Sequence, residues 1–128
     1  MVRNPEEMAE ILRNWSSVFT ACSSISNRIS PLHRDAQTSV NWYDILATVG
    51  TYSGAVMEFP GVGIRLEYSP GTVVGISGKI VRHGVSDWDE GGERVCLASY
   101  LRTNVFRRLG VGMPHWSNWN RILAEVKE

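Results

Sequence analysis

The chain has 128 residues, of which 43% are hydrophobic and 20% are charged, a balance typical of one folded domain and not of a disordered chain. Thirteen Lys and Arg side chains balance thirteen Asp and Glu, so a nucleic-acid partner would need a local basic patch. No apolar run reaches the roughly 18 residues of a membrane span, and the first residues lack the apolar segment of a signal peptide. We therefore expect a single domain over residues 1–128, in an intracellular protein without a membrane partner.

Both ends of the chain carry helix signals. Asn4 is a suitable N-cap, Pro5 suits the first helical position, and Glu7 lies three residues after the cap. Near the other end, Ser117 is a candidate cap for an apolar stripe that runs to Val126. The sequence therefore predicts a flanking helix at each end.

The chain between these helices has the pattern of strands and turns. Stretches that alternate, or that are rich in β-branched and aromatic residues, occupy residues 17–27, 44–57, 64–68, 72–77, 79–85 and 93–101. Turns that contain Gly or Pro separate several of them. Such close spacing favours an antiparallel sandwich or barrel over alternating βαβ units. We expect a mainly β protein with its core at about residues 17–109.

Cys22 and Cys96 are the two cysteines. Without a signal peptide we expect reduced thiols, and the alternating apolar stretch around each one favours a small buried strand residue over a redox role. Two thiols are too few for a zinc ribbon or an iron–sulfur cluster. A metal ion would therefore have to be held by His and carboxylate side chains.

His33 and Asp35 are two positions apart. On a strand or at its edge, residues i and i+2 point to the same side, so both side chains can reach one metal ion. The alternative is a surface turn made of His33, Arg34 and Asp35. The distant His83 favours the metal site over the surface turn, because two histidines and one carboxylate form a facial triad that suits non-haem Fe(II).

Arg94 opens the predicted strand 93–101. If it points into an apolar barrel, it needs an anion, and a guanidinium grips a carboxylate with two parallel hydrogen bonds. The alternative is an outward side chain paired with Glu93 or Glu67. Because strands alternate, Arg94 shares one face with Cys96, Ala98 and Tyr100.

These residues, in this order, resemble the 2-oxoglutarate/Fe(II)-dependent dioxygenases over roughly residues 17–109. The motifs are His33-Arg34-Asp35, Ser69-Pro70-Gly71-Thr72 at the start of a strand, His83-Gly84-Val85 and Gly92-Glu93-Arg94. Within that superfamily, three segments are similar to the fungal branch of the TET/JBP group, whose characterised members oxidise methyl groups on nucleic-acid bases. These segments are residues 27–35, Trp42-Tyr43-Asp44 and Ser77-Gly78-Lys79.

The resemblance implies a double-stranded β-helix (jelly roll) that uses Fe(II) and 2-oxoglutarate. It assigns the iron to His33, Asp35 and His83, and it assigns the distal carboxylate of 2-oxoglutarate to Arg94. Cys96 lies beside that arginine, where TET and JBP proteins have serine. The substrate side of the site would hold Tyr100, Thr38 and Arg28, and Thr38 stands where TET proteins have a base-contacting asparagine.

The resemblance thus predicts a dioxygenase that hydroxylates a methyl group, preferably on a methylated base in DNA or RNA such as 5-methylcytosine. With a DNA substrate the protein would be nuclear. The alternatives are an enzyme for a small molecule or a protein side chain, and an inactive, truncated core. Tyr100 is expected either to stack on the base or to close the end of the barrel. Trp88 lies in a polar, acidic loop, where we expect little core for it to join.

Overall fold

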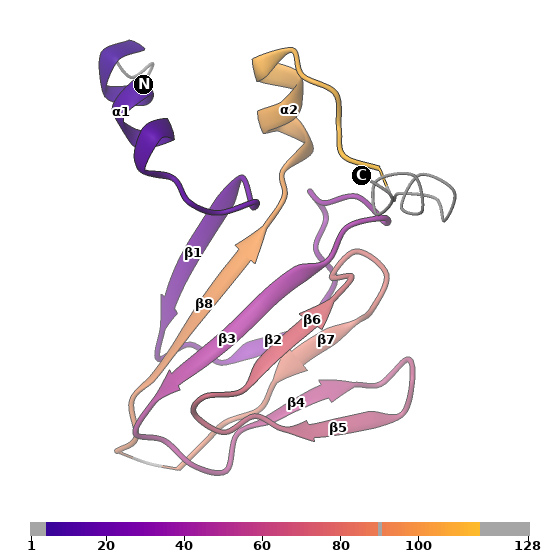
Figure 1. The fold of residues 1–128 in the computed structure, drawn as a ribbon. Helices are drawn as coiled ribbons and strands as arrows, with labels where there is room; N and C mark the ends of the chain where they lie inside the picture. The colour runs from indigo at the N-terminus through magenta and orange to yellow at the C-terminus, as the bar shows by residue number, and fades with distance from the viewer. Residues whose placement is uncertain (1–4, 90, 116–128) are drawn as a thin grey trace, which may run out of the picture.

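The computed structural model describes residues 5–89 and 91–115. Within them, two short helices accompany eight strands, and both helices lie beyond the same end of the strands (Figure 1). The helices are α1 (Pro5–Asn14) and α2 (Thr103–Leu109). The strands are β1 (Ala21–Ser26), β2 (Ser30–His33), β3 (Asp44–Gly50), β4 (Val56–Phe59), β5 (Ile64–Glu67), β6 (Val73–Ile76), β7 (His83–Val85) and β8 (Arg94–Tyr100).

The strands form two antiparallel sheets, in the orders β1-β8-β3-β6 and β2-β7-β4-β5 (Figure 1). Apart from the β4–β5 hairpin, each strand passes to the other sheet before the next one begins. This winding is that of a jelly roll, so the predicted mainly β, antiparallel fold is confirmed. Two sheets packed face to face bury one side of each strand, and the site lies between them.

The stretch 44–57 is two strands, β3 and β4, in different sheets, and not one continuous strand. The break begins at Gly50, whose φ of 143° is rare for residues with a side chain. A Cβ at Gly50 would also collide with the backbone carbonyl of Glu93. Strand propensity does not mark this break, because it depends on the neighbouring chain.

The sequence did not predict β2 as a strand, and it predicted β7 as longer than it is. β2 contains Pro31, which cannot donate a ladder hydrogen bond, and it is tolerated because β2 is an edge strand. The first part of the predicted strand 79–85 is a turn, in which the N–H groups of Ile80 and Val81 donate to the carbonyl of Ser77. The strand proper starts at His83.

Helix α1 begins at Pro5, as the capping pattern predicts. Helix α2, directly after β8, was not predicted, and it ends at Gly110 in the left-handed conformation typical of a C-cap. The helix predicted from Ser117 lies outside the described residues. Neither helix in the described part of the chain is long and apolar enough to cross a membrane.

The core between the sheets is a cluster of buried apolar side chains. Its members are Tyr52, Ala55, Met57, Phe59, Tyr68, Ile76 and Val85. Trp88 packs against this cluster, lies edge-on to Tyr52, and donates from Nε1 to the carbonyl of Gly92 at 2.9 Å. The expectation that Trp88 has little core to join is therefore wrong, because its loop folds back over the barrel.

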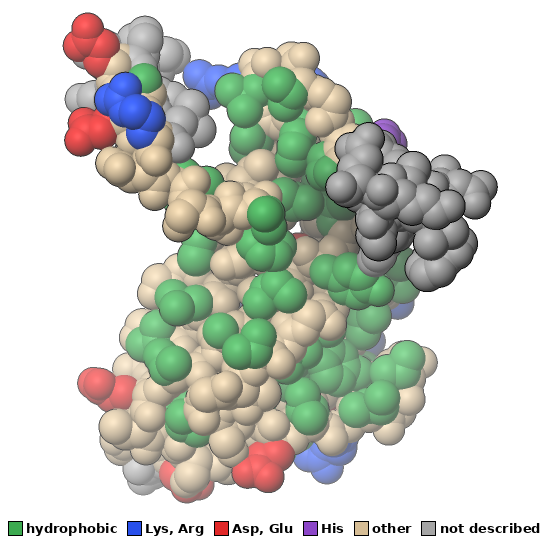
Figure 2. Space-filling model, viewed as in Figure 1, with side chains coloured by type: hydrophobic (Ala, Val, Ile, Leu, Met, Phe, Trp, Pro, Cys, Tyr) green, Lys and Arg blue, Asp and Glu red, His purple; other side chains and the backbone are tan. Residues whose placement is uncertain are grey.

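The exposed positions of the strands β1, β8, β3 and β6 carry uncharged residues. On the face drawn in Figure 2, hydrophobic side chains are scattered over the strands, and acidic and basic side chains lie mainly around the edge. Val49, Val73 and Leu97 are exposed apolar residues of this kind. Cys22 is exposed as well, contrary to the prediction, because it occupies an outward position of the alternating edge strand β1. Cys96 is buried, as predicted.

Candidate metal centre

The two strands β2 and β7 bring His33 and His83 together. These residues are direct partners in the antiparallel register, and their ring centroids are 4.4 Å apart. Close approach of the strands depends on Gly84, because a Cβ there would lie 2.8 Å from the Ser30 carbonyl oxygen and 2.9 Å from the Leu32 nitrogen. Glycine at position 84 therefore lets the two histidines meet.

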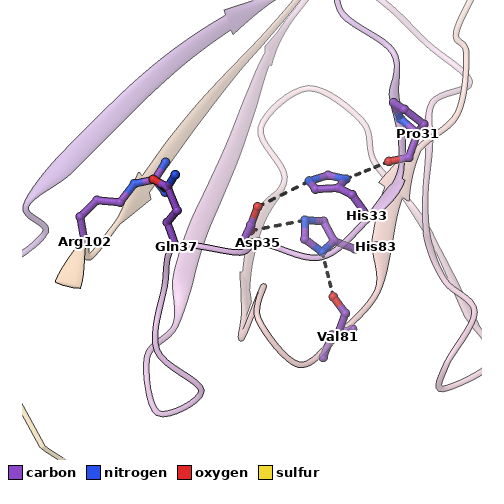
Figure 3. Close-up of polar contacts among 7 residues, drawn as sticks. All are labelled: Pro31, His33, Asp35, Gln37, Val81, His83 and Arg102. Carbon is purple, nitrogen blue, oxygen red and sulfur yellow. Dashed lines mark hydrogen bonds and ion pairs between the residues drawn. The ribbon is translucent and has the colours of Figure 1, made fainter. Parts of the chain in front are cut away.

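Backbone carbonyls orient both imidazole rings. The Nδ1 atom of His33 lies 2.8 Å from the carbonyl oxygen of Pro31, and Nδ1 of His83 lies 2.9 Å from that of Val81 (Figure 3). A carbonyl oxygen only accepts, so each Nδ1 carries the hydrogen, and each neutral ring keeps its lone pair on Nε2. This is the tautomer in which a histidine binds a metal through Nε2.

Asp35 completes the group. One carboxylate oxygen lies 3.6 Å from Nε2 of His33, and the other lies 3.9 Å from Nε2 of His83 (Figure 3). One ligand atom from each residue lies within 4.8 Å of the other two. The Nε2 lone pairs of both histidines face the Asp35 carboxylate, and they are repelled by it unless a cation lies between them. The three residues therefore fit a divalent metal ion. Two nitrogens and one oxygen suit Fe(II) and leave coordination positions open for other ligands.

Asp44 is a fourth polar residue in this region, which sequence reasoning did not assign to the site. It is 3% exposed at the start of β3, and burial, together with the neighbouring Asp35 carboxylate, raises its pKa to about 6. The Gly78 N–H and the Arg102 charge lie nearby and act in the opposite direction. A Cβ at Gly78 would collide with carboxylate oxygens of both aspartates, so the two acidic groups flank this glycine. The only feature of the sequence that drew attention to Asp44 was the segment Trp42-Tyr43-Asp44, which is similar to the TET/JBP group.

Arg94 lies buried at the start of β8, with 2% of its surface exposed. Its backbone N–H donates to Oδ1 of Asn27, and Nη1 donates to the carbonyl of Arg28 at 3.3 Å. Nε has no partner among the described residues, and none of their carboxylates forms an ion pair with this guanidinium. The alternative pairing with Glu93 or Glu67 is thus not seen in this part of the chain. Nε and the adjacent amino group form an edge that fits the carboxylate of a ligand.

Three aromatic rings surround the Arg94 guanidinium. Its central carbon lies 5.1 Å from the ring centroid of Tyr68, 5.5 Å from that of Trp88 and 5.9 Å from that of Tyr52. Cation–π attraction to the rings lowers the cost of burying the charge but does not replace an anion. Tyr68 is fully buried, and its pKa is raised by burial and by the neighbouring Cys96.

One pocket of about 250 Å³ joins these features. All the residues that the sequence singled out as candidates line it, although they come from distant parts of the chain. They are Arg28, His33, Asp35, Thr38, His83, Arg94, Cys96 and Tyr100. The alternation predicted along β8 is confirmed, because Arg94, Cys96, Ala98 and Tyr100 all contribute to the wall.

Tyr100 lies at the end of β8 with its side chain held on two sides. Its hydroxyl is 2.7 Å from Oγ of Ser23, and the Arg102 guanidinium lies over its ring at 4.4 Å from the centroid. The Ser23 hydrogen bond and Arg102 lower the pKa of Tyr100. Arg102 also donates from Nη1 to Oε1 of Gln37 at 3.0 Å (Figure 3).

A jelly roll with two histidines and a carboxylate on one side of a pocket, and an unpaired buried arginine in the same wall, defines the site of an Fe(II)/2-oxoglutarate dioxygenase. Residues 2–103 match the model of the Tet_JBP family, the oxygenase domain of the 2OGFeDO superfamily, and the chain belongs to this family. It is therefore a 2-oxoglutarate- and Fe(II)-dependent dioxygenase. No curated protein matches the chain.

Proposed function

We propose that this dioxygenase hydroxylates the methyl group of a methylated nucleic-acid base, with 5-methylcytosine as the first candidate. The observation that carries the proposal is the aromatic and cationic pair of Tyr100 and Arg102 in the wall of the pocket that holds His33, Asp35 and His83. An aromatic ring offers a flat surface to an extruded base, and an arginine near it can contact a phosphate. On this proposal the protein is intracellular, and nuclear if the substrate is DNA.

Each residue of the proposed site has a distinct task. His33, Asp35 and His83 would hold Fe(II), which together with 2-oxoglutarate supplies the oxidation of the C–H bond. Arg94 would bind the distal carboxylate of 2-oxoglutarate and so set its orientation, with Cys96 beside it. Tyr100, Thr38 and Arg28, which line the same pocket, would position the substrate.

The test is the formation of succinate and of a hydroxymethyl base in one assay. The purified protein is given Fe(II), 2-oxoglutarate and single- or double-stranded oligonucleotides that carry 5-methylcytosine, and the products are measured by mass spectrometry. The proposal requires hydroxymethylcytosine that disappears when iron or 2-oxoglutarate is omitted. Succinate without any oxidised base would instead favour a small-molecule or protein substrate. The absence of succinate under all conditions would identify an inactive domain.

Tyr100→Ala is expected to reduce base oxidation much more than the turnover of 2-oxoglutarate to succinate without substrate. The reason is that a stacking ring orients the substrate but not the co-substrate. Both rates are measured in the same preparation, and their ratio should change by roughly 5-fold to 150-fold if each stacked base contributes about 1–3 kcal/mol.

Two variants serve as controls for this experiment. Tyr100→Phe keeps the ring and loses only the hydrogen bond to Ser23, so it should recover most of the base oxidation. Tyr43→Ala removes an exposed tyrosine that does not line the pocket and should leave the ratio of the two rates unchanged. Equal losses of both rates in Tyr100→Ala would make Tyr100 a packing residue at the end of the barrel.

A further inference from the structure

Unpaired polar atoms gather in the wall of the pocket. Among the residues that the structure describes, four buried side-chain atoms have no hydrogen-bond partner. They are Nε of Arg94, Oγ1 of Thr38 and both carboxylate oxygens of Asp44, and all three residues line the same pocket. Buried polar groups are normally paired, so unpaired ones in a pocket indicate positions that a ligand satisfies. The carboxylate of 2-oxoglutarate accounts for the Arg94 atom, and the substrate role already proposed for Thr38 accounts for its hydroxyl, whereas the two Asp44 oxygens have no role so far.

Asp44 has no evident task in the centre described above. It lies outside the group of three possible metal ligands formed by His33, Asp35 and His83. Among the described residues no basic side chain forms an ion pair with it, and Arg102 is hydrogen-bonded to Gln37 instead. The Gly78 N–H lies near this carboxylate and lowers its pKa, but one such donor does not satisfy both oxygens. A 3% exposed carboxylate with so few protein donors needs a donor from the ligand.

We propose that Asp44 recognises the polar edge of the substrate, and that it does so next to Thr38, which the proposed function already assigns to the substrate. An ionised carboxylate only accepts hydrogen bonds, so Asp44 selects a substrate that presents an N–H donor, while the Thr38 hydroxyl makes a second hydrogen bond. The substrate class is a nitrogen heterocycle with an amino group near the methyl group that is oxidised. This inference rests on the proposed function and adds to it the feature of the base that is read.

The position of Asp44 agrees with this task. Asp44 and Asp35 flank Gly78, so the proposed recognition group lies beside a proposed metal ligand. A base held by its amino group at Asp44 would therefore be kept near the centre that oxidises it. The arrangement also rejects the wrong base, because a carbonyl oxygen in place of the amino group would set two acceptors against each other in a buried site.

The experiment uses two oligonucleotides that differ at one base, 5-methylcytosine or thymine. Both bases carry the same 5-methyl group, but beside it cytosine has an amino group and thymine has a carbonyl oxygen. The metal-loaded protein is compared with Asp44→Asn, Thr38→Val and Asp87→Asn, and the last makes the same carboxylate-to-amide change on an exposed loop residue. The amount of oxidised base is measured by mass spectrometry. It is divided by the amount of succinate formed without nucleic acid, because this succinate reports how much active enzyme each preparation contains.

We expect the unchanged protein and Asp87→Asn to prefer 5-methylcytosine over thymine by on the order of 10²-fold or more. Asp44→Asn should narrow this preference by roughly tenfold or more, because the amide can donate to the thymine carbonyl. Thr38→Val should narrow it less. If Asp44→Asn does not fold or does not load metal, Thr38→Val decides, and a narrower preference in that variant supports the inference.

Three outcomes would overturn the inference. Equal oxidation of the two bases by the unchanged protein rejects it, and so does an unchanged preference in Asp44→Asn that forms succinate. Succinate formation without oxidation of either base also rejects it, although the protein is then still a working dioxygenase. If the protein forms no succinate at all, the proposed function is rejected together with this inference. Succinate formation therefore distinguishes a failure of the inference alone from a failure of the proposed function.

Discussion

His33→Ala is expected to abolish the formation of succinate from 2-oxoglutarate, and Asp35→Ala and His83→Ala are expected to do the same. On this assignment each residue would supply one of the three protein donor atoms, and the remaining two would not hold Fe(II) in an ordered geometry. The measurement is succinate formation at saturating iron, together with Mn(II) binding by calorimetry. In a metal-loaded structure, all three side chains should lie about 2.0–2.2 Å from one ion, by analogy with other first-row metals.

The three ligand variants differ in their expected effect on stability. The side chains of His33 and Asp35 are 41% and 40% exposed, so replacing them should change the free energy of unfolding little. His83 is 5% exposed, so its replacement should lower the free energy of unfolding more than that of His33 or Asp35. His115→Ala, at an exposed histidine, is the matched control and should retain activity. A metal-loaded structure in which His83 points away from the ion would contradict this assignment.

Arg94→Ala is expected to raise the concentration of 2-oxoglutarate needed for turnover by roughly 10²-fold or more. Losing a buried, charge-assisted pair costs about 2–5 kcal/mol, and no other cation in the described part of the chain is buried to the same degree. Arg94→Lys should recover only part of the affinity, because a point charge does not reproduce the planar fork. The measurement is the KM for 2-oxoglutarate, with kcat determined separately.

A comparison of co-substrates separates the role of Arg94 in binding from its role in packing. The unchanged protein should prefer 2-oxoglutarate over a 2-oxo acid without the distal carboxylate, and Arg94→Ala should lose this preference even if it is less stable. Arg65→Ala is the matched control, because Arg65 is an exposed arginine that does not line the pocket. If Arg94→Ala binds 2-oxoglutarate as tightly as the unchanged protein, the anchor is another arginine, and Arg82 and Arg102 become the candidates.

Local patterns in the sequence were sufficient for several features of this protein. The period of two along β8 placed Arg94, Cys96 and Tyr100 on one face, because side chains alternate along any strand. The helix start at Pro5 followed from its capping pattern. The motifs around His33 and His83 pointed to the family to which the chain belongs. The first two features depend on neighbours within a few residues, and the third depends on short motifs and their order along the chain.

The tertiary structure decided the features that depend on distant parts of the chain. His33 and His83 face each other only because β2 pairs with β7, and the short, proline-containing β2 gave no strand signal. The burial of Asp44 and the packing of Trp88 beside Arg94 likewise depend on segments that the winding of the jelly roll brings together. A local pattern does not encode such contacts, since whether a polar side chain is buried without a partner is determined by everything that packs around it.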